Sequence, residues 1–156
     1  MTIYFYIAQE NPYGCFSNFA YYGFELDGKW WSTSEHYYQT QKFITTEPDW
    51  ALRISRAKTP TEAAKMGRDR SHLLRSDWEE VKDAIMTKAV LKKFQTHKQL
   101  SDILLATGDE LIVENSPVDY YWGCGRDGTG KNRLGEILMN VRAILLKDES
   151  KKQELK

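Results

Sequence analysis

Four polar residues recur at helical spacing in the segment SEHYYQTQKF, residues 34–43. They are Glu35, Tyr38, Gln39 and Lys42, at positions i, i+3, i+4 and i+7. Residues at this spacing share one face of a helix, so a carboxylate, a phenol, an amide and an ammonium group would form one stripe that can line a cleft. Glu35 has an alternative role, because with Ser32 it would complete a capping box at the start of the helix.

Lys82 interrupts the apolar stripe of another predicted helix. It stands four residues after Trp78, three before Ile85 and four before Met86. Partial desolvation at such a position favours the neutral amine, which is nucleophilic toward a carbonyl or anomeric carbon. A nearby carboxylate would oppose this effect. The alternative is that the aliphatic stem of Lys82 lies on apolar surface and its charge reaches water.

The glycine-rich segment GCGRDGTGKN, residues 123–132, is similar to a phosphate-binding loop of nucleotide triphosphatases. That loop requires Ser or Thr after its lysine to ligate magnesium, and a strand before it. Asn132 follows Lys131 here, and the preceding SPVDYYWG is short and begins with a proline. The sequence therefore disfavours a nucleotide triphosphatase.

The elements that position these residues are predicted to be mainly helical. IYFYI at residues 3–7 indicates a strand, and FELDGKWW at residues 24–31 indicates a hairpin that turns at Asp27-Gly28. Helix starts are predicted at Ser32 with Glu35, Thr59-Pro60 with Glu62, Ser76 with Glu79, and Asn132. We expect a predominantly α-helical α+β fold with a small β-sheet, as a single domain over residues 1–147 and a frayed charged tail at residues 148–156.

Composition excludes several classes of protein. Lys and Arg number 22, as do Asp and Glu, so no broad electrostatic surface for nucleic acid or anionic lipid is expected. Cys15 and Cys124 belong to no metal-spaced cluster, which indicates free thiols in a reducing cytosol and no metal site. No stretch is long and apolar enough to span a membrane, so we expect a cytoplasmic protein with no membrane partner.

Six ordered blocks of the sequence resemble the NADAR (YbiA-like) family across nearly the whole chain. They are FSNF at 16–19, SEHYYQTQKF at 34–43, DWEEVKDAIM at 77–86, LLATG at 104–108, DYYWGCG at 119–125 and GKNRLGEILMNVR at 130–142. The resemblance implies that the glycine-rich segment borders a ribosyl-phosphate pocket, with Trp122, Gly123 and Asn132 at its edge.

The resemblance further implies cleavage of an N-glycosidic bond between a ribose and a base-like leaving group, without a metal or redox cofactor. Such cleavage needs a carboxyl group that exchanges protons near the sugar, for which Glu35 is the candidate. Lys82 could attack C1 of the ribose and carry it as a Schiff base before hydrolysis. Asp119 could orient a water or a ribose hydroxyl, or could stabilise a turn before YYWG.

Substrate recognition is predicted to use planar and polar side chains. Phe16, Trp78 and Trp122 are candidates to stack on the base, although each could instead be a core residue. Arg68 and backbone N–H groups near Gly123 could hold a phosphate, and Arg70 or Arg75 could replace Arg68 in this role. The remaining candidates for hydrogen bonds to sugar or base are Asn18 and Asn132, the second of which could instead cap the last helix.

The leading prediction is a hydrolase of phosphoribosylamino-pyrimidine intermediates of riboflavin biosynthesis. One alternative is an enzyme that removes ADP-ribose from guanine, the only case in which nucleic acid would be a partner. Another is a binding module for NAD or ADP-ribose without turnover. Glu35 together with Lys82 argues against the binding module, because binding alone does not require a proton donor beside an amine.

Overall fold

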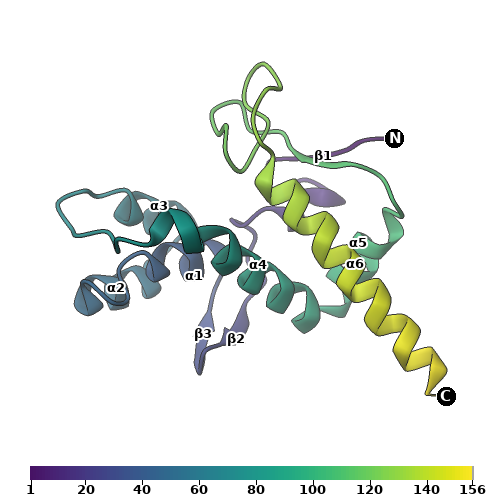
Figure 1. The fold of residues 1–156 in the computed structure, drawn as a ribbon, viewed down its shortest axis with the longest axis horizontal. Coiled ribbons are helices and arrows are strands. Elements are labelled where there is room, and N and C mark those ends of the chain that lie inside the picture. The colour runs from purple at the N-terminus through teal and green to yellow at the C-terminus, as the bar shows by residue number, and fades with distance from the viewer. Residues whose placement is uncertain (156) are drawn as a thin grey trace. The chain divides into compact units, whose positions relative to one another are not determined.

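The structure, a computed structural model, describes residues 1–155. In chain order the elements are β1 Ile3–Phe5, the 3-10 helix η1 Tyr13–Phe16, β2 Phe24–Leu26, β3 Lys29–Trp31, α1 Ser34–Gln41, α2 Pro48–Ser55, α3 Pro60–Gly67, α4 Trp78–Thr96, α5 Lys98–Ala106, β4 Ile112–Glu114 and α6 Arg133–Glu154 (Figure 1). The predicted mainly helical α+β class is confirmed. The strands form two two-stranded sheets, whereas one small sheet was predicted.

The chain divides into two compact units. The central unit is Tyr21–Lys93, and the terminal unit combines Met1–Ala20 with the chain from Phe94 onward. In the part of the chain that the structure describes, no helix is both long and apolar enough to cross a membrane.

The central unit begins with the hairpin of β2 and β3. These strands are antiparallel, with Leu26 opposite Lys29, and the two turn residues have positive φ angles of 55° at Asp27 and 75° at Gly28. Positive φ at both positions defines the turn that matches the twist of two-residue hairpins. The predicted hairpin is therefore confirmed. The Asp27 carboxylate also accepts hydrogen bonds from the hydroxyl of Tyr37 at 2.8 Å and from Nζ of Lys88 at 2.7 Å, which ties the turn to α1 and α4.

Two apolar clusters form the core of the central unit. The first consists of Phe24, Trp31, Tyr37 and Ala89, and the second of Phe43, Ala51, Ile54 and Ala63. Helix α1 contacts α2, α3 and β3, and all eight of its residues are buried, although most of them are polar. A buried helix with this composition is unfavourable unless its polar groups are paired or functional.

The start of α1 corrects one prediction. Its N-cap is Thr33, whose hydroxyl accepts a hydrogen bond from the backbone N–H of His36 at 3.2 Å. The predicted capping box of Ser32 with Glu35 is wrong, because the N-cap is one residue later and Glu35 stands at the second helical position and not at the third, which a capping box requires.

The other helix boundaries agree with the sequence to different degrees. Thr59 caps α3 as predicted, accepting from the N–H of Glu62 at 3.1 Å. Helix α4 begins at Trp78, two residues after the predicted cap Ser76. Helix α2 was not predicted, although Pro48 in its first turn is a usual signal of a helix start.

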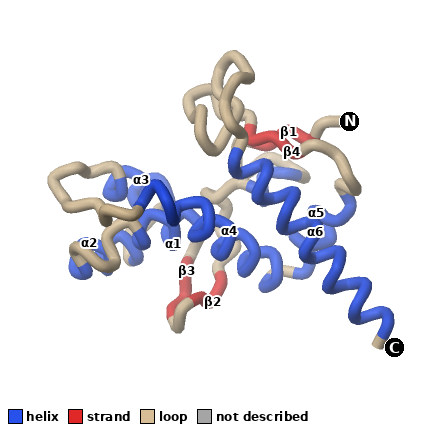
Figure 2. The backbone as a smooth tube through the Cα atoms, in the orientation of Figure 1, coloured by secondary structure: helices blue, strands red, loops and turns tan. Residues whose placement is uncertain are grey.

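The terminal unit contains the second sheet, in which β1 pairs with β4 in parallel (Figure 2). Ile3 lies opposite Ile112, which is buried, and the strand β4 was not predicted. Asn132 fixes β4 to the start of α6, because its side chain donates to the carbonyl of Ile112 and accepts from the N–H of Glu114, both at 2.9 Å.

Helix α6 packs against β4 and α5. Arg142 of α6 donates to the hydroxyl of Thr107 at 2.8 Å and to the carbonyl of Glu110 at 2.9 Å, which closes the end of α5 onto α6. The helix continues to Glu154, so the segment predicted as a frayed tail from residue 148 is helical through that residue.

Candidate active site

The polar stripe of α1 places a buried carboxylate in the centre of the central unit. Glu35 is 8% exposed and Gln39 is 5% exposed. The side-chain amide of Gln39 donates from Nε2 to Oε1 of Glu35 at 2.6 Å, a short hydrogen bond. Since Thr33 caps the helix, the Glu35 carboxylate takes part in this stripe and not in a capping box.

Lys42 lies next along the stripe and is 6% exposed. Its Nζ is 3.5 Å from the carbonyl of Gly67 and faces the rings of Tyr38 at 5.5 Å and Trp78 at 5.7 Å. Burial lowers the pKa of Lys42 from 10.5 to about 8, because desolvation disfavours the ammonium form. The nearby Glu35 carboxylate raises this pKa and so opposes part of the effect.

Three further cations act on Lys42. Arg70, Arg68 and Lys82 each lower its pKa by like-charge repulsion. Arg70 also donates to the carbonyl of Gly67 at 3.1 Å, so Lys42 and Arg70 share one acceptor. We call Lys42, Arg68, Arg70 and Lys82 the cation cluster. Basic side chains gathered in this way suit an anionic ligand such as a phosphate.

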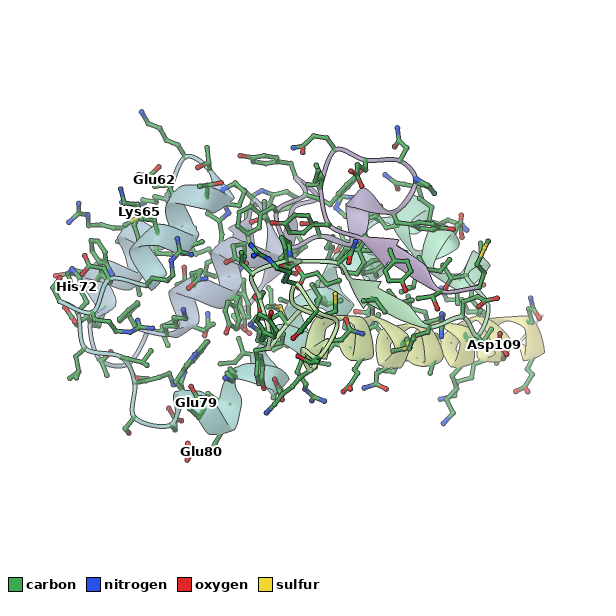
Figure 3. All side chains as sticks on the ribbon, turned by 90° about the horizontal axis from the view of Figure 1, so that it is seen from above. Glu62, Lys65, His72, Glu79, Glu80 and Asp109 are labelled. Atoms are coloured by element: carbon green, nitrogen blue, oxygen red, sulfur yellow. The ribbon has the colours of Figure 1, made fainter. Side chains whose placement is uncertain are left out.

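Lys82 has a carboxylate partner within its own helix. Its Nζ is 2.6 Å from Oε2 of Glu79, and its side chain is 14% exposed whereas that of Glu79 is 78% exposed. Figure 3 shows Glu79 and Glu80 at the start of α4. The Lys82 side chain is therefore mostly withdrawn from water, which is one of the two alternatives stated from the sequence, and its amine is paired with the exposed Glu79.

Trp78 belongs to the same neighbourhood. Its ring lies 5.0 Å from that of Tyr38 at an interplanar angle of 57°, and it is 5% exposed. Both rings face the Lys42 ammonium, which is a cation–π arrangement. Arg75, the third arginine considered for phosphate binding, instead forms a bidentate ion pair with Asp77 at 2.6 and 3.0 Å. This pairing leaves Arg68 and Arg70 as the arginines of the cation cluster.

The remaining predicted site residues lie in the terminal unit. Asp119 stabilises a turn, because its Oδ1 accepts from the N–H groups of Tyr121 at 2.9 Å and Trp122 at 2.8 Å. Trp122 packs edge-to-face against Tyr121, with ring centroids 4.8 Å apart. Stabilisation of a turn was one of the two roles predicted for Asp119. Its hydrogen bonds agree with this role.

Gly123 and Asn132 lie in the glycine-rich segment and have structural contacts. A side chain at Gly123 would approach the Glu114 carbonyl and the Ser116 side chain to 3.0 Å, and the Gly123 carbonyl accepts from the N–H of Asn132 at 3.0 Å. Asn132 has a positive φ of 53° at the N-cap of α6, but its side chain binds β4 and makes no capping hydrogen bond. The segment is therefore held by its own backbone against β4.

Phe16 and Asn18 complete the predicted set. Phe16 is 1% exposed and contacts the rings of Phe5, Tyr13 and Phe94 at 5.5–5.8 Å, so its position is that of a core residue. Asn18 is buried as well.

The structure thus brings together Glu35, Arg68, Trp78 and Lys82 of the predicted residues. From the sequence, Lys42 was placed on the polar stripe without a catalytic or binding role, and Arg70 was only an alternative to Arg68. The signal for Lys42 was present, because it stands seven residues after Glu35 on a helix with few apolar residues. For Arg70 no local pattern distinguishes it from its neighbours. Among residues 1–155, no group of three or more His, Cys, Asp and Glu side chains could hold a metal ion.

Comparisons with known proteins agree with the family resemblance. The NADAR domain matches residues 4–146. An N-glycosidase of Nostoc punctiforme is 54% identical over 144 residues, which cover 91% of each protein. The N-glycosidase YbiA of Escherichia coli is 48% identical over 144 residues, covering 92% of this chain and 89% of YbiA.

A solved structure and a plant protein extend these similarities. The NMR structure of E. coli YbiA matches with a TM-score of 0.86 at 46% identity, covering 96% of this chain and 89% of that one. The chloroplastic riboflavin biosynthesis protein PYRR of Zea mays is 40% identical over 147 residues, covering 86% of this chain and 24% of the maize protein.

Proposed function

The chain belongs to the NADAR family and is a hydrolase of N-glycosyl bonds, and on this premise we propose that it cleaves the C–N bond between a ribose phosphate and a base-like amine. The substrates are phosphoribosylamino-pyrimidine intermediates of riboflavin biosynthesis. The similarity to a maize protein named for riboflavin biosynthesis supports this choice.

The observation that carries the proposal is the buried carboxylate of Glu35 beside the cation cluster. The exposed Arg68 and Arg70 can reach a phosphate dianion and hold the sugar in place. Glu35 then transfers a proton to the departing nitrogen, which accumulates negative charge as the C–N bond breaks. The same carboxylate, once ionised, stabilises the positive charge that develops on the ribose.

A covalent route uses one of two amines, that of Lys82 or that of Lys42. The amine of Lys82, once deprotonated, attacks C1 of the ribose while the bond from C1 to the leaving nitrogen breaks and that nitrogen takes the proton from Glu35. The Glu35 carboxylate then takes one proton from the ribosylamine formed on Lys82 and passes it to the ring oxygen as the bond from C1 to that oxygen breaks, which leaves a protonated imine on Lys82. Water hydrolyses this imine, which restores the lysine and releases the ribose phosphate. Lys42 is the second candidate for this role, because its pKa of about 8 leaves roughly a quarter of the amine neutral at pH 7.5.

Borohydride trapping during turnover distinguishes the two amines. Reduction of the imine leaves a stable ribosyl adduct, and peptide mapping by mass spectrometry locates it. An adduct on Lys82 that disappears in Lys82→Arg, together with turnover, identifies Lys82 as the nucleophile, because arginine keeps the charge but forms no such imine. An adduct on Lys42 assigns the step to that residue, and no adduct at either lysine refutes the covalent route.

The activity itself is tested with a panel of ribosylated amines, followed by detection of free ribose 5-phosphate. Glu35→Gln is expected to stay folded and to lose about two or more orders of magnitude in cleavage, because the amide cannot transfer the proton. ADP-ribosylated guanine belongs in the panel, and its preferential cleavage would replace the proposed substrate class. Tight binding of NAD or ADP-ribose with no cleavage of any compound would instead identify a binding module.

A further inference from the structure

The side-chain amide of Gln39 lies between Glu35 and Gly67. Its nitrogen donates to the Glu35 carboxylate at 2.6 Å. Its oxygen Oε1 is buried and has no hydrogen-bond partner within residues 1–155. A buried amide oxygen without a partner is unfavourable, so another interaction must hold the group in this orientation.

The orientation follows from the chemistry of the two groups. Oε1 of Glu35 accepts the hydrogen bond, and a carboxyl oxygen that carries no proton can accept whether or not the other oxygen is protonated, so the NH2 end of Gln39 faces Glu35 and the amide oxygen points away from it. The oxygen points at Gly67, where a Cβ atom would lie 1.9 Å from Oε1 and 2.6 Å from Cδ of Gln39. The three atoms that such a Cβ would meet first all belong to Gln39.

The close approach of the Gln39 side chain therefore explains why position 67 is a glycine. Gly67 is a helical residue of α3, so its backbone conformation is open to any residue. Its carbonyl also accepts from Lys42 and Arg70. One residue thus leaves room for the amide that contacts Glu35 and fixes two members of the cation cluster.

We propose that Gln39 is a positioning residue that holds the Glu35 carboxylate for proton transfer, and that Gly67 lacks a side chain in order to admit it. This inference rests on the proposed function. Because Gly67 contacts both Gln39 and the cation cluster, the Glu35 carboxylate and these cations keep fixed positions relative to one another. Glu35 can then reach the leaving nitrogen while the cations bind the phosphate of the same substrate.

The first test is Gln39→Met, which keeps the length of the side chain and removes the hydrogen bond. We expect kcat to fall about 10- to 100-fold with little change in KM, because a misplaced proton donor affects the transition state while the cation cluster still binds the phosphate. Gln41→Met is the matched control, since Gln41 lies on the same helix and is also buried. A kcat within about twofold of wild type in Gln39→Met would overturn the proposal.

A double-mutant cycle tests the role of Gly67. Gly67→Ala should lower kcat to a similar extent, because its Cβ displaces the amide. In Gln39→Ala the displaced atoms are absent, and only Cβ of residue 39 remains near, at 3.1 Å. Adding Gly67→Ala to Gln39→Ala should therefore cost little more activity, whereas losses that multiply would refute the coupling.

The third measurement does not depend on turnover. The side-chain amide resonances of Gln39 in a 1H–15N NMR spectrum should shift in both Glu35→Gln and Gly67→Ala. Unshifted resonances in these two variants would overturn the positioning role. If the wild-type protein is inactive on every ribosylated amine, the proposed function is refuted instead. If Gln39→Met does not fold, Gly67→Ala still tests the proposal, because its Cβ displaces the same amide from the opposite side.

Discussion

The lowered pKa of Lys42 leads to a measurable dependence of stability on pH. In the unfolded chain this amine has the ordinary value of 10.5, and in the folded protein burial lowers the pKa of Lys42 to about 8. This lowering of the pKa corresponds to about 3 kcal/mol between the two protonation states. Glu35 limits the shift, and Arg68, Arg70 and Lys82 add to it.

The sign follows from proton counting. Well below pH 8 both states hold the proton, so the cost of the buried ammonium is fully present. Between pH 8 and 10.5 the unfolded state binds more protons, so the free energy of unfolding rises with pH. Relative to pH 7, the contribution of Lys42 is expected to grow by about 1 kcal/mol at pH 9 and about 2.5 kcal/mol at pH 10.

Urea denaturation of wild type and Lys42→Met between pH 7 and pH 10 measures this effect. The difference between their free energies of unfolding should change by these amounts in favour of wild type, because only wild type can lose the proton. Lys65→Met is the control, since Lys65 is exposed on α3 (Figure 3). A difference that stays flat, or a 13Cε resonance of Lys42 that titrates near 10.5, would refute a desolvated amine at this position.

Three further outcomes are expected. Cleavage should survive exhaustive EDTA treatment, because the proposed steps use only side chains of the chain; loss on chelation with recovery on adding zinc or magnesium would contradict this. Thr33→Ala should lower the free energy of unfolding by about 1 kcal/mol through loss of the α1 cap, whereas Ser32→Ala should change it by less than about 0.5 kcal/mol, as urea denaturation can show. Gly135→Ala should destabilise more than either, because its Cβ would lie 2.2 Å from the carbonyl of Ile112; a melting temperature equal to that of wild type would disprove this clash.

Local signals in the sequence were sufficient for much of the secondary structure. The Asp27-Gly28 turn is specified by two residues that tolerate positive φ, and the start of α3 by Thr59 followed by proline. The start of α1 was misplaced by one residue because Ser32, Thr33 and Ser34 are all good caps, and only the packed backbone selects Thr33. The strand β4 is three residues long and exists because β1, more than one hundred residues earlier, pairs with it.

The sequence by itself was sufficient to predict the family, the polar stripe of α1 and the place of Glu35 on that stripe, because motifs and helical spacing are properties of neighbouring residues. Only the tertiary structure decided which charges meet. The pKa of Lys42 depends on its burial and on charges from the segment after α3 and from α4, and the contact between Gln39 and Gly67 joins two helices. Desolvation and charge interactions act through space. A helix therefore only positions a side chain, and residues that are distant along the chain set its pKa.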